Sequence, residues 1–325
     1  MNREDLLKAL DDKFQGLNQK TELHLEGLLH SPVFNYWDYI KTDTLLSLQE
    51  QRTVLPDEMI FIMYHQVNEL LFKMILWELD QLAREENITA DFFTKHLSRV
   101  SRYFDVLSNS FEVMGAGMER EQYLKFRTAL APGSGFQSEQ YRKIELASTE
   151  IINLIDARYR ENIDRNTSYE HAFEHLYWQA AGKDYKTGEK SIFLKDFEKK
   201  YKKGLLDFME FHNTRNLYTK YLELPEADKQ NLDLINAMRH YDHNVNIKWV
   251  LSHYNAAGRY LGGSDKEKDI EATGGSNWRK YMHPKYQRRI FFPTLWTAEE
   301  LKNWGKVNLE KIDLIENYST FQENQ

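Results

Sequence analysis

Four side chains that could bind a small ligand lie in two pairs. Phe61 and His65 are four positions apart, as are Tyr123 and Arg127, so each pair shares one face if its segment is helical. An arginine offers a planar fork that fits a carboxylate, and a tyrosine adds a hydroxyl. A histidine on a buried helix is most often a hydrogen-bonded core residue, whereas one that faces a cavity can accept a proton or a hydrogen bond. The pairs predict either buried polar contacts or a carboxylate clamp beside a neutral imidazole.

A further histidine, His253, is followed one turn later by Ala256 and Ala257. Small neighbours leave the open space that a haem needs beside an axial histidine. His240 and His243 lie nearby in the chain and are rival ligands. The residues alone leave open which of the three histidines would hold an iron.

The chain breaks sharply after the second pair, at Pro132–Gly135. Because glycine has no side chain, the backbone here and the side chain of Ser134 can come close to a flat ligand. Two later Gly-rich segments, 262–263 and 273–276, lack the G-x-x-x-x-G-K-[ST] pattern, which argues against a nucleoside triphosphate site.

The sequence contains no cysteine, so metal chemistry must come from its 11 histidines and its carboxylates. Disulfides, zinc fingers and iron–sulfur clusters are excluded. His171 and His175 have the spacing of a metal-binding pair, but no third ligand is evident, so a solvated helix face is the simpler interpretation. The lack of cysteine is typical of a reducing compartment, and we expect a cytoplasmic protein.

The composition is that of a globular helical protein. Hydrophobic residues make up 41% and charged residues 29%, and the formal net charge is −7. The 15 glycines and 6 prolines are few for a fold with many tight turns, which favours long helices. We expect no signal peptide and no membrane span, because the N-terminus is acidic and no apolar run is long enough. Scattered basic residues give no nucleic-acid footprint.

Hydrophobic periodicity predicts an all-α fold, with residues 1–325 in a single large domain. The segment after Pro56 is apolar around nearly its whole circumference, so we expect a central, buried helix at 57–84. We expect residues 166–203 to form a peripheral insertion. Further helices are predicted at 4–17, 44–51, 89–114, 122–130, 138–160, 204–223, 226–261 and 296–318.

Taken in order, these motifs resemble those of the tryptophan 2,3-dioxygenase family. The run FIMYHQVNEL at 61–70 matches F-I-x-x-H-Q-x-x-E-L, and FNYWDYI at 34–40 resembles the aromatic Y-x-x-Y-[LI] segment. YLKFR at 123–127, followed by PGSGFQSEQYR at 132–142, matches Y-x-x-F-R and P-x-S-G-F-Q-S-x-Q-Y-R. His253 with Arg259 and Gly262 fits the haem-ligand helix, and TGGS at 273–276 fits the T-G-G-S loop.

The resemblance implies one haem b per subunit, in a pocket between the central helices. His253 would be the proximal ligand of the haem iron. Ser134 and Gly135 would lie at the haem, Ser134 on its distal side. His65 would be the distal, catalytic histidine and would accept a hydrogen bond from the indole N–H of the substrate.

The resemblance also implies how the substrate is bound. Phe61 would pack on the indole ring, and Arg127 and Tyr123 would hold the carboxylate. Thr273 would help to hold the ammonium group. The family is typically homotetrameric, and the pocket would also be lined from a neighbouring subunit by residues of an N-terminal arm (1–50), namely Tyr36, Tyr39 and Ile40.

The implied activity is the insertion of O₂ across the indole C2–C3 bond of L-tryptophan, which gives N-formylkynurenine and begins tryptophan catabolism by the kynurenine route. Two alternatives remain. Where the family commonly has tryptophan this chain has Leu71, so a related haem oxygenase could act on another indole or aromatic amino acid. A haem-binding sensor without turnover is the other alternative, but gas sensing does not need a carboxylate clamp such as Arg127.

Overall fold

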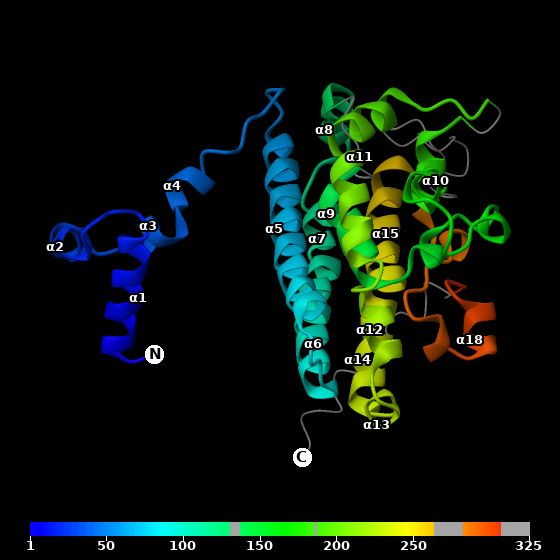
Figure 1. Ribbon diagram of the computed structural model, residues 1–325. Coiled ribbons are helices and arrows are strands. Elements are labelled where there is room, and N and C mark those ends of the chain that lie inside the picture. The colour runs from blue at the N-terminus through cyan, green and yellow to red at the C-terminus, as the bar shows by residue number, and fades with distance from the viewer. Residues whose placement is uncertain (131–136, 185–186, 263–281, 307–325) are drawn as a thin grey trace, which may run out of the picture. The chain divides into compact units, whose positions relative to one another are not determined.

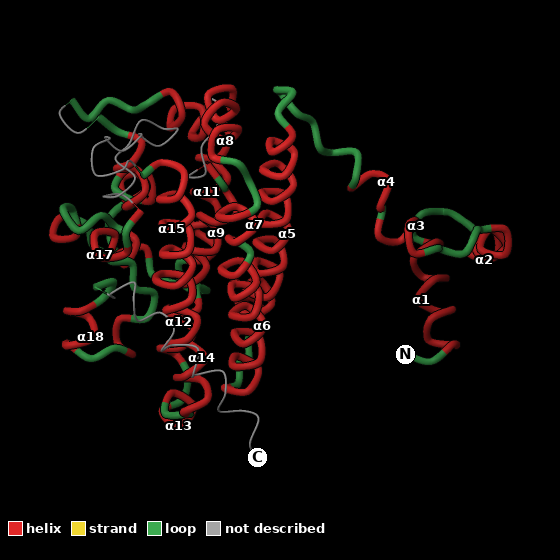
Figure 2. Tube along the Cα trace, turned by 180° about the vertical axis from the view of Figure 1, so that it is seen from behind, coloured by secondary structure: helices red, strands yellow, loops and turns green. Residues whose placement is uncertain are grey.

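The computed structural model describes residues 1–130, 137–184, 187–262 and 282–306. The chain divides into two compact units, residues 1–49 and residues 50–325. Within the described ranges the regular secondary structure is helical, apart from two isolated β-bridges (Figures 1 and 2). The all-α prediction is therefore confirmed. None of the described helices combines the length and the apolar character that a membrane crossing requires.

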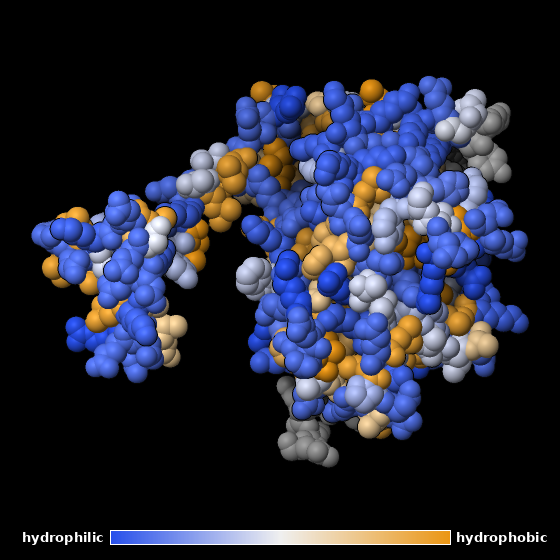
Figure 3. Space-filling view, viewed as in Figure 1, coloured by the Kyte–Doolittle hydropathy of each residue, from blue (hydrophilic) through white to orange (hydrophobic). Residues whose placement is uncertain are grey.

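The first unit consists of short helices without a hydrophobic core. Its helices are α1 (Arg3–Gln15), α2 (Thr21–His30), α3 (Tyr36–Ile40) and α4 (Thr42–Leu45). Among residues 1–49, all of which are described, only Thr21 is buried. Its apolar side chains lie on the surface, as the orange residues of this unit in Figure 3 illustrate. Such a unit gains little stability from burial of its own side chains.

The longest helix, α5 (Pro56–Arg84), begins with the expected proline in its first turn. One face is buried in the second unit, through residues such as Phe72, Ile75 and Leu79. The opposite face exposes a row of apolar side chains: Met63, Val67, Leu70, Met74 and Trp77. The prediction of a helix buried on all sides is wrong for this chain as described. Both faces of α5 are apolar, but the second unit covers only one of them.

The core of the second unit is a bundle of long helices. Helix α6 (Ala90–Asn109) packs against α5 and against α14 (Leu232–His243), and α9 (Glu139–Ser148) packs against α5 and α11 (Ile192–His212). Fully buried side chains from these helices include Leu97, Phe104, Ile144 and Met238. Shorter elements complete the described part of the unit: α7 (Phe111–Ala116), α8 (Arg120–Phe126), α10 (Tyr169–Glu174), α12 (Leu217–Glu223), α13 (Glu226–Lys229), α15 (Trp249–Leu261), α17 (Pro284–Gln287) and α18 (Ala298–Asn303).

Several predicted helix boundaries are wrong, for reasons that lie in tertiary contacts. The helix predicted at 138–160 ends at Ser148, because Thr149 is extended and its hydroxyl donates a hydrogen bond to the backbone oxygen of Phe291, 2.6 Å away. The helix predicted at 89–114 is divided at Ser110 into α6 and α7. At the C-terminal end only α18 is described, and residues from 307 onward lie outside the described range.

Residues 166–203, expected as a peripheral insertion, contribute to the main core. Phe173, Leu194 and Phe197 are buried there at 2% exposure or less. Helix α11 begins inside this stretch, with Ser191 as its N-cap, twelve residues before the predicted start at 204. Exposed lysines such as Lys195 and Lys199 lie on the outer face of this helix, which also carries the buried Phe197.

Candidate active site

His65 lies on α5, one turn after Phe61, and its protonation is fixed by one contact. Its Nδ1 lies 2.7 Å from the carbonyl oxygen of Phe61. Because a carbonyl only accepts hydrogen bonds, Nδ1 carries the proton and donates it. Burial lowers the pKa of His65, against weaker raising effects of this hydrogen bond and of Glu69. The ring is therefore neutral at pH 7, and Nε2 has a free lone pair that can accept a hydrogen bond.

The ring of Phe61 joins the two residue pairs that the sequence singled out. Its centroid lies 4.1 Å from that of His65 and 6.2 Å from that of Tyr123. A third ring, that of the fully buried Phe126, contacts Phe61 at 5.5 Å and Tyr123 at 5.6 Å. The structure thus brings together pairs that are about sixty residues apart in the chain.

Arg127 follows α8 directly and begins a 3-10 turn, Arg127–Leu130. It is buried, with 9% of its surface exposed, and its guanidinium carbon lies 6.0 Å from the ring centre of Tyr123. Burial raises the pKa of Tyr123, and the charge of Arg127 opposes this rise. The tyrosine is therefore neutral at pH 7 and keeps a hydroxyl beside a positive charge. These two groups can bind a carboxylate together.

Asp57, which the sequence analysis did not single out, fixes α8 to the start of α5. Its carboxylate accepts a hydrogen bond from the backbone N–H of Glu119 at 2.7 Å, and its own backbone N–H donates to Gln122 at 3.2 Å. The helix that carries Tyr123 is thereby held in register with the helix that carries His65. The only sequence signal for this contact is an acidic residue in the first turn of a predicted helix.

His253 lies on α15, far from His65 in the sequence, and its ring packs in the same region. Its ring stacks on Phe111, with centroids 5.3 Å apart and planes within 14° of parallel. Burial, and to a lesser extent the charge of His65, lowers its pKa to about 4. Among the described residues, no hydrogen-bond partner is found for either ring nitrogen of His253.

Apolar side chains contact both histidines, and part of the His65 side chain remains exposed. The ring centroid of Tyr64 lies 5.7 Å from that of His65 and 6.0 Å from that of Phe111. The ring of Phe111 in turn stacks on that of His253. The buried members of this cluster are Tyr64, Phe111, Met114, Met118, Phe126, Ala256, Tyr260 and Leu261. It is separate from the main core of the bundle.

Trp249 connects the helix of His253 to the main core. It lies one turn before His253, at a ring distance of 5.8 Å. Its other face stacks on Tyr141 at 4.8 Å. Tyr141 belongs to the QYR motif, whose Arg142 forms an ion pair with the buried Glu145 at 2.7 Å. The motif therefore contacts Trp249, which in turn contacts His253. The sequence of the motif did not indicate this role.

The rival histidines do not share this position. His240 and His243 lie on α14, and burial lowers the pKa of both, that of His243 to about 4. The charges that influence their pKa values are those of Asp105 and Lys248 for His240, and of His240 and Lys248 for His243. Of the three candidates, only His253 has a pKa that the charge of His65 influences.

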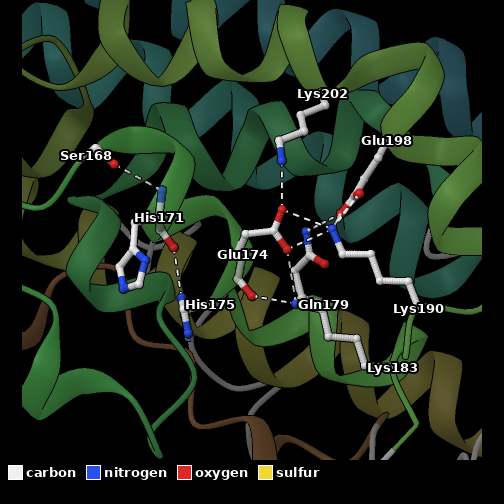
Figure 4. A network of polar contacts seen from close by, with 9 residues as sticks. All are labelled: Ser168, His171, Glu174, His175, Gln179, Lys183, Lys190, Glu198 and Lys202. Atoms are coloured by element: carbon white, nitrogen blue, oxygen red, sulfur yellow. Dashed lines mark hydrogen bonds and ion pairs between the residues drawn. The ribbon is translucent and has the colours of Figure 1, made fainter. Parts of the chain in front are cut away.

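His171 and His175 lie beside a network of polar contacts. Nδ1 of His175 donates to the backbone oxygen of His171 at 2.8 Å, and Glu174 is held by Lys183, Lys190 and Lys202 (Figure 4). Within the described residues, no three histidine or acidic side chains cluster where they could hold a metal ion.

Some of the predicted site residues cannot be placed in this site. Ser134, Gly135 and Thr273 lie outside the described residues. Tyr36, Tyr39 and Ile40 lie on α3 of the first unit, where all three are exposed. Their predicted contributions to the pocket remain predictions.

The donor set of the described site fits a haem. A neutral imidazole with a free nitrogen is the form in which histidine binds iron, and His253 meets that condition. The small Ala256 lies beside it, and the surrounding cluster is apolar. A second imidazole, that of His65, stands close by with its own Nδ1 already bonded to Phe61.

Comparison with known proteins identifies the family of the chain. A sequence model described as Tryptophan 2,3-dioxygenase matches residues 27–207. A protein named tryptophan 2,3-dioxygenase from Bacillus thuringiensis subsp. konkukian is 28% identical over 276 residues, which cover 81% of this chain and 91% of that protein. One of the same name from Geobacillus thermodenitrificans is 26% identical over 292 residues, covering 86% and 98%. One from Ruegeria sp. is 46% identical over 114 residues, covering 34% and 40%.

Proposed function

Because the chain belongs to the tryptophan 2,3-dioxygenase family, we propose that it is a haem-dependent oxidoreductase that adds both atoms of O₂ to L-tryptophan and forms N-formylkynurenine. The observation that carries this proposal is the state of His65. Its Nδ1 proton is committed to Phe61, so its Nε2 must accept, as an indole N–H requires. The aromatic path from His65 through Tyr64 and Phe111 to His253 supports a common site.

His253 would hold the haem iron as its proximal ligand. When bound, the haem supplies the position at which O₂ is bound and activated. His65 must remain unligated so that this position stays open, and its Nδ1 hydrogen bond to Phe61 helps to keep the ring on α5 in place. Ser134 and Gly135 would contribute on the distal side, as the family motif implies.

The other residues would hold the substrate in one orientation. Arg127 and Tyr123 would bind the carboxylate, and Phe61 would pack against the indole ring. His65 would accept the indole N–H at the opposite end. Fixing the two ends of the substrate keeps the C2–C3 bond in one place, which lowers the entropic cost of the reaction. Thr273 would assist at the ammonium group.

We also propose that the active form is a homotetramer. The apolar row on α5 repeats every three or four residues, from Met63 to Trp77, which is the spacing of a helix that packs along another helix. Trp77 is 70% exposed. The first unit likewise exposes Tyr36 and Tyr39. A second copy of the chain would cover both surfaces, since a patch of this kind is seldom left open to water.

The direct experiment is turnover by the full chain loaded with haem and fully reduced. With L-tryptophan and O₂ we expect N-formylkynurenine, identified by its near-ultraviolet absorbance and its mass. The His253→Ala variant should lose haem. A fully ferrous, haem-loaded sample that gives no product from L-tryptophan would contradict the proposal, and a spectral change on adding tryptophan without product would favour the sensor alternative.

The second alternative, another aromatic substrate, has lost its main motivation. Leu71 is partly buried against the main core and is not a member of the cluster around His65 and His253. Its side chain is therefore placed to affect packing rather than substrate choice. A panel of indoles and aromatic amino acids, scored by product mass, tests this directly.

A further inference from the structure

The helix that carries His253 contains a π-helical turn. Helix α14 runs into α15 through η6 (Asn244–Lys248), which is π-helical, so that the two lie in line in Figure 1. A π turn holds one more residue than an α turn, so each residue beyond it is rotated by about 100° relative to an uninterrupted α-helix. His253 comes five residues after the turn. The turn therefore determines which way this histidine faces.

Asp242, at the end of α14, holds the turn from one side. Its carboxylate is fully buried and accepts four hydrogen bonds. Within the helix, Nδ2 of Asn246 donates at 2.7 Å. From a distant segment, the backbone N–H groups of Phe291 and Phe292 donate at 2.9 and 3.1 Å, and Nε1 of Trp296 at 2.9 Å. One carboxylate thus connects the π turn to residues about fifty positions later.

Asp105 of α6 holds the turn from another side. Its Oδ1 accepts a hydrogen bond from Nδ2 of Asn244 at 3.1 Å and pairs with Nζ of Lys248 at 3.0 Å. Asn244 and Lys248 are the first and last residues of the turn. Both ends of the π turn are therefore fixed to a neighbouring helix.

We propose that Asp242, Asn246 and Asp105 are positioning residues for His253: they hold the π turn and so set the rotation at which its imidazole faces His65. The inference rests on the proposed function, in which His253 binds the haem iron. A hydrogen bond donated by Asn246 inside the turn helps to keep the extra residue in place. Without it, the turn is free to relax, and α15 can rotate about its axis.

The test compares two buried asparagines. Asn246→Ala removes the bond to Asp242, whereas Asn216→Ala removes the N-cap of α12, where Asn216 is equally buried and accepts from the backbone N–H of Thr219 at 2.9 Å. Two properties of the haem-loaded variants are measured: the rate of haem release to excess apomyoglobin, and the iron–histidine stretching band of the ferrous protein by resonance Raman spectroscopy. Asp105→Ala, at a part-exposed side chain, provides a milder second variant.

We expect Asn246→Ala to release haem about tenfold faster and to shift the iron–histidine band, as loss of a supporting partner commonly does. Asn216→Ala should lower the melting temperature but leave both haem properties as in the unmodified protein. An unshifted band and an unchanged release rate in both Asn246→Ala and Asp105→Ala overturn the inference. If instead His253→Ala binds haem normally, the proposed function itself fails, so the two failures are distinguishable.

Discussion

Replacing Arg127 by alanine tests the carboxylate clamp most directly. In the structure its guanidinium is buried beside the ring of Tyr123, on the turn that follows α8. A bound carboxylate would receive two charge-assisted hydrogen bonds from it in water-poor surroundings. Because the carboxylate is remote from the reacting C2–C3 bond, these bonds form in the ground state and in the transition state alike. Their loss should appear mainly as a rise in KM.

The magnitude follows from the number and kind of these bonds. A hydrogen bond to a charged group contributes about 1.5–3 kcal/mol, so two of them contribute at least about 3 kcal/mol. Since each ~1.4 kcal/mol is a factor of ten, kcat/KM should fall by at least roughly 100-fold. The hydroxyl of Tyr123 would remain, but a single neutral donor compensates only in part.

The assay compares L-tryptophan with tryptamine, which lacks the carboxylate. The unmodified enzyme should discriminate between them by about the factor that Arg127→Ala loses, and the variant should discriminate little. Haem content should not change. Lys125→Ala is the matched control, because it removes the same charge from the last turn of α8, two positions before Arg127 and on a different face. An unchanged KM in Arg127→Ala, or discrimination that survives it, would refute the clamp.

Three further predictions concern His65, His212 and the exposed face of α5. Burial lowers the pKa of His65 below its usual 6.5, so the neutral, accepting form of the ring persists down to that pH. We therefore expect kcat/KM to stay constant from neutral pH to about 6.5 and to fall only below it. A fall centred above pH 7 that is absent in His65→Ala would contradict this role. Burial lowers the pKa of His212 to about 4, so between pH 6.5 and 4 the unfolded chain binds a proton that the folded chain does not. The melting temperature should therefore drop as the pH falls from 6.5 towards 4, and it should drop less steeply in His212→Gln. An equal dependence of melting temperature on pH in the two proteins would contradict this prediction. Val67→Glu, on the exposed face of α5, should dissociate the oligomer, which light scattering would report as a lower mass. Lys73→Glu changes an exposed charge on the same helix and should leave the mass unchanged. An unchanged mass for Val67→Glu would place the interface elsewhere.

Local patterns in the chain predicted the helical fold, the long helix from Pro56 and the two pairs at i and i+4. These features depend on residues that are neighbours along one helix, and their spacing can be counted in the chain. The sequence also determined the family, because the motif runs at 61–70 and 132–142 are long and specific.

The sequence could not choose between the three candidate histidines, because that choice depends on which one lies near His65 in the folded chain. The tertiary structure favours His253, whose role as a haem ligand stays a proposal. It also placed Asp57 as the tie between α5 and α8, and it showed that Phe173 and Phe197 belong to the core rather than to a peripheral insertion. The end of α9 at Ser148 is a similar case, since the hydroxyl of Thr149 bonds to a residue far along the chain. Local periodicity records which face of a helix is apolar, but what covers that face is set by segments distant in sequence, and only folding brings those segments together.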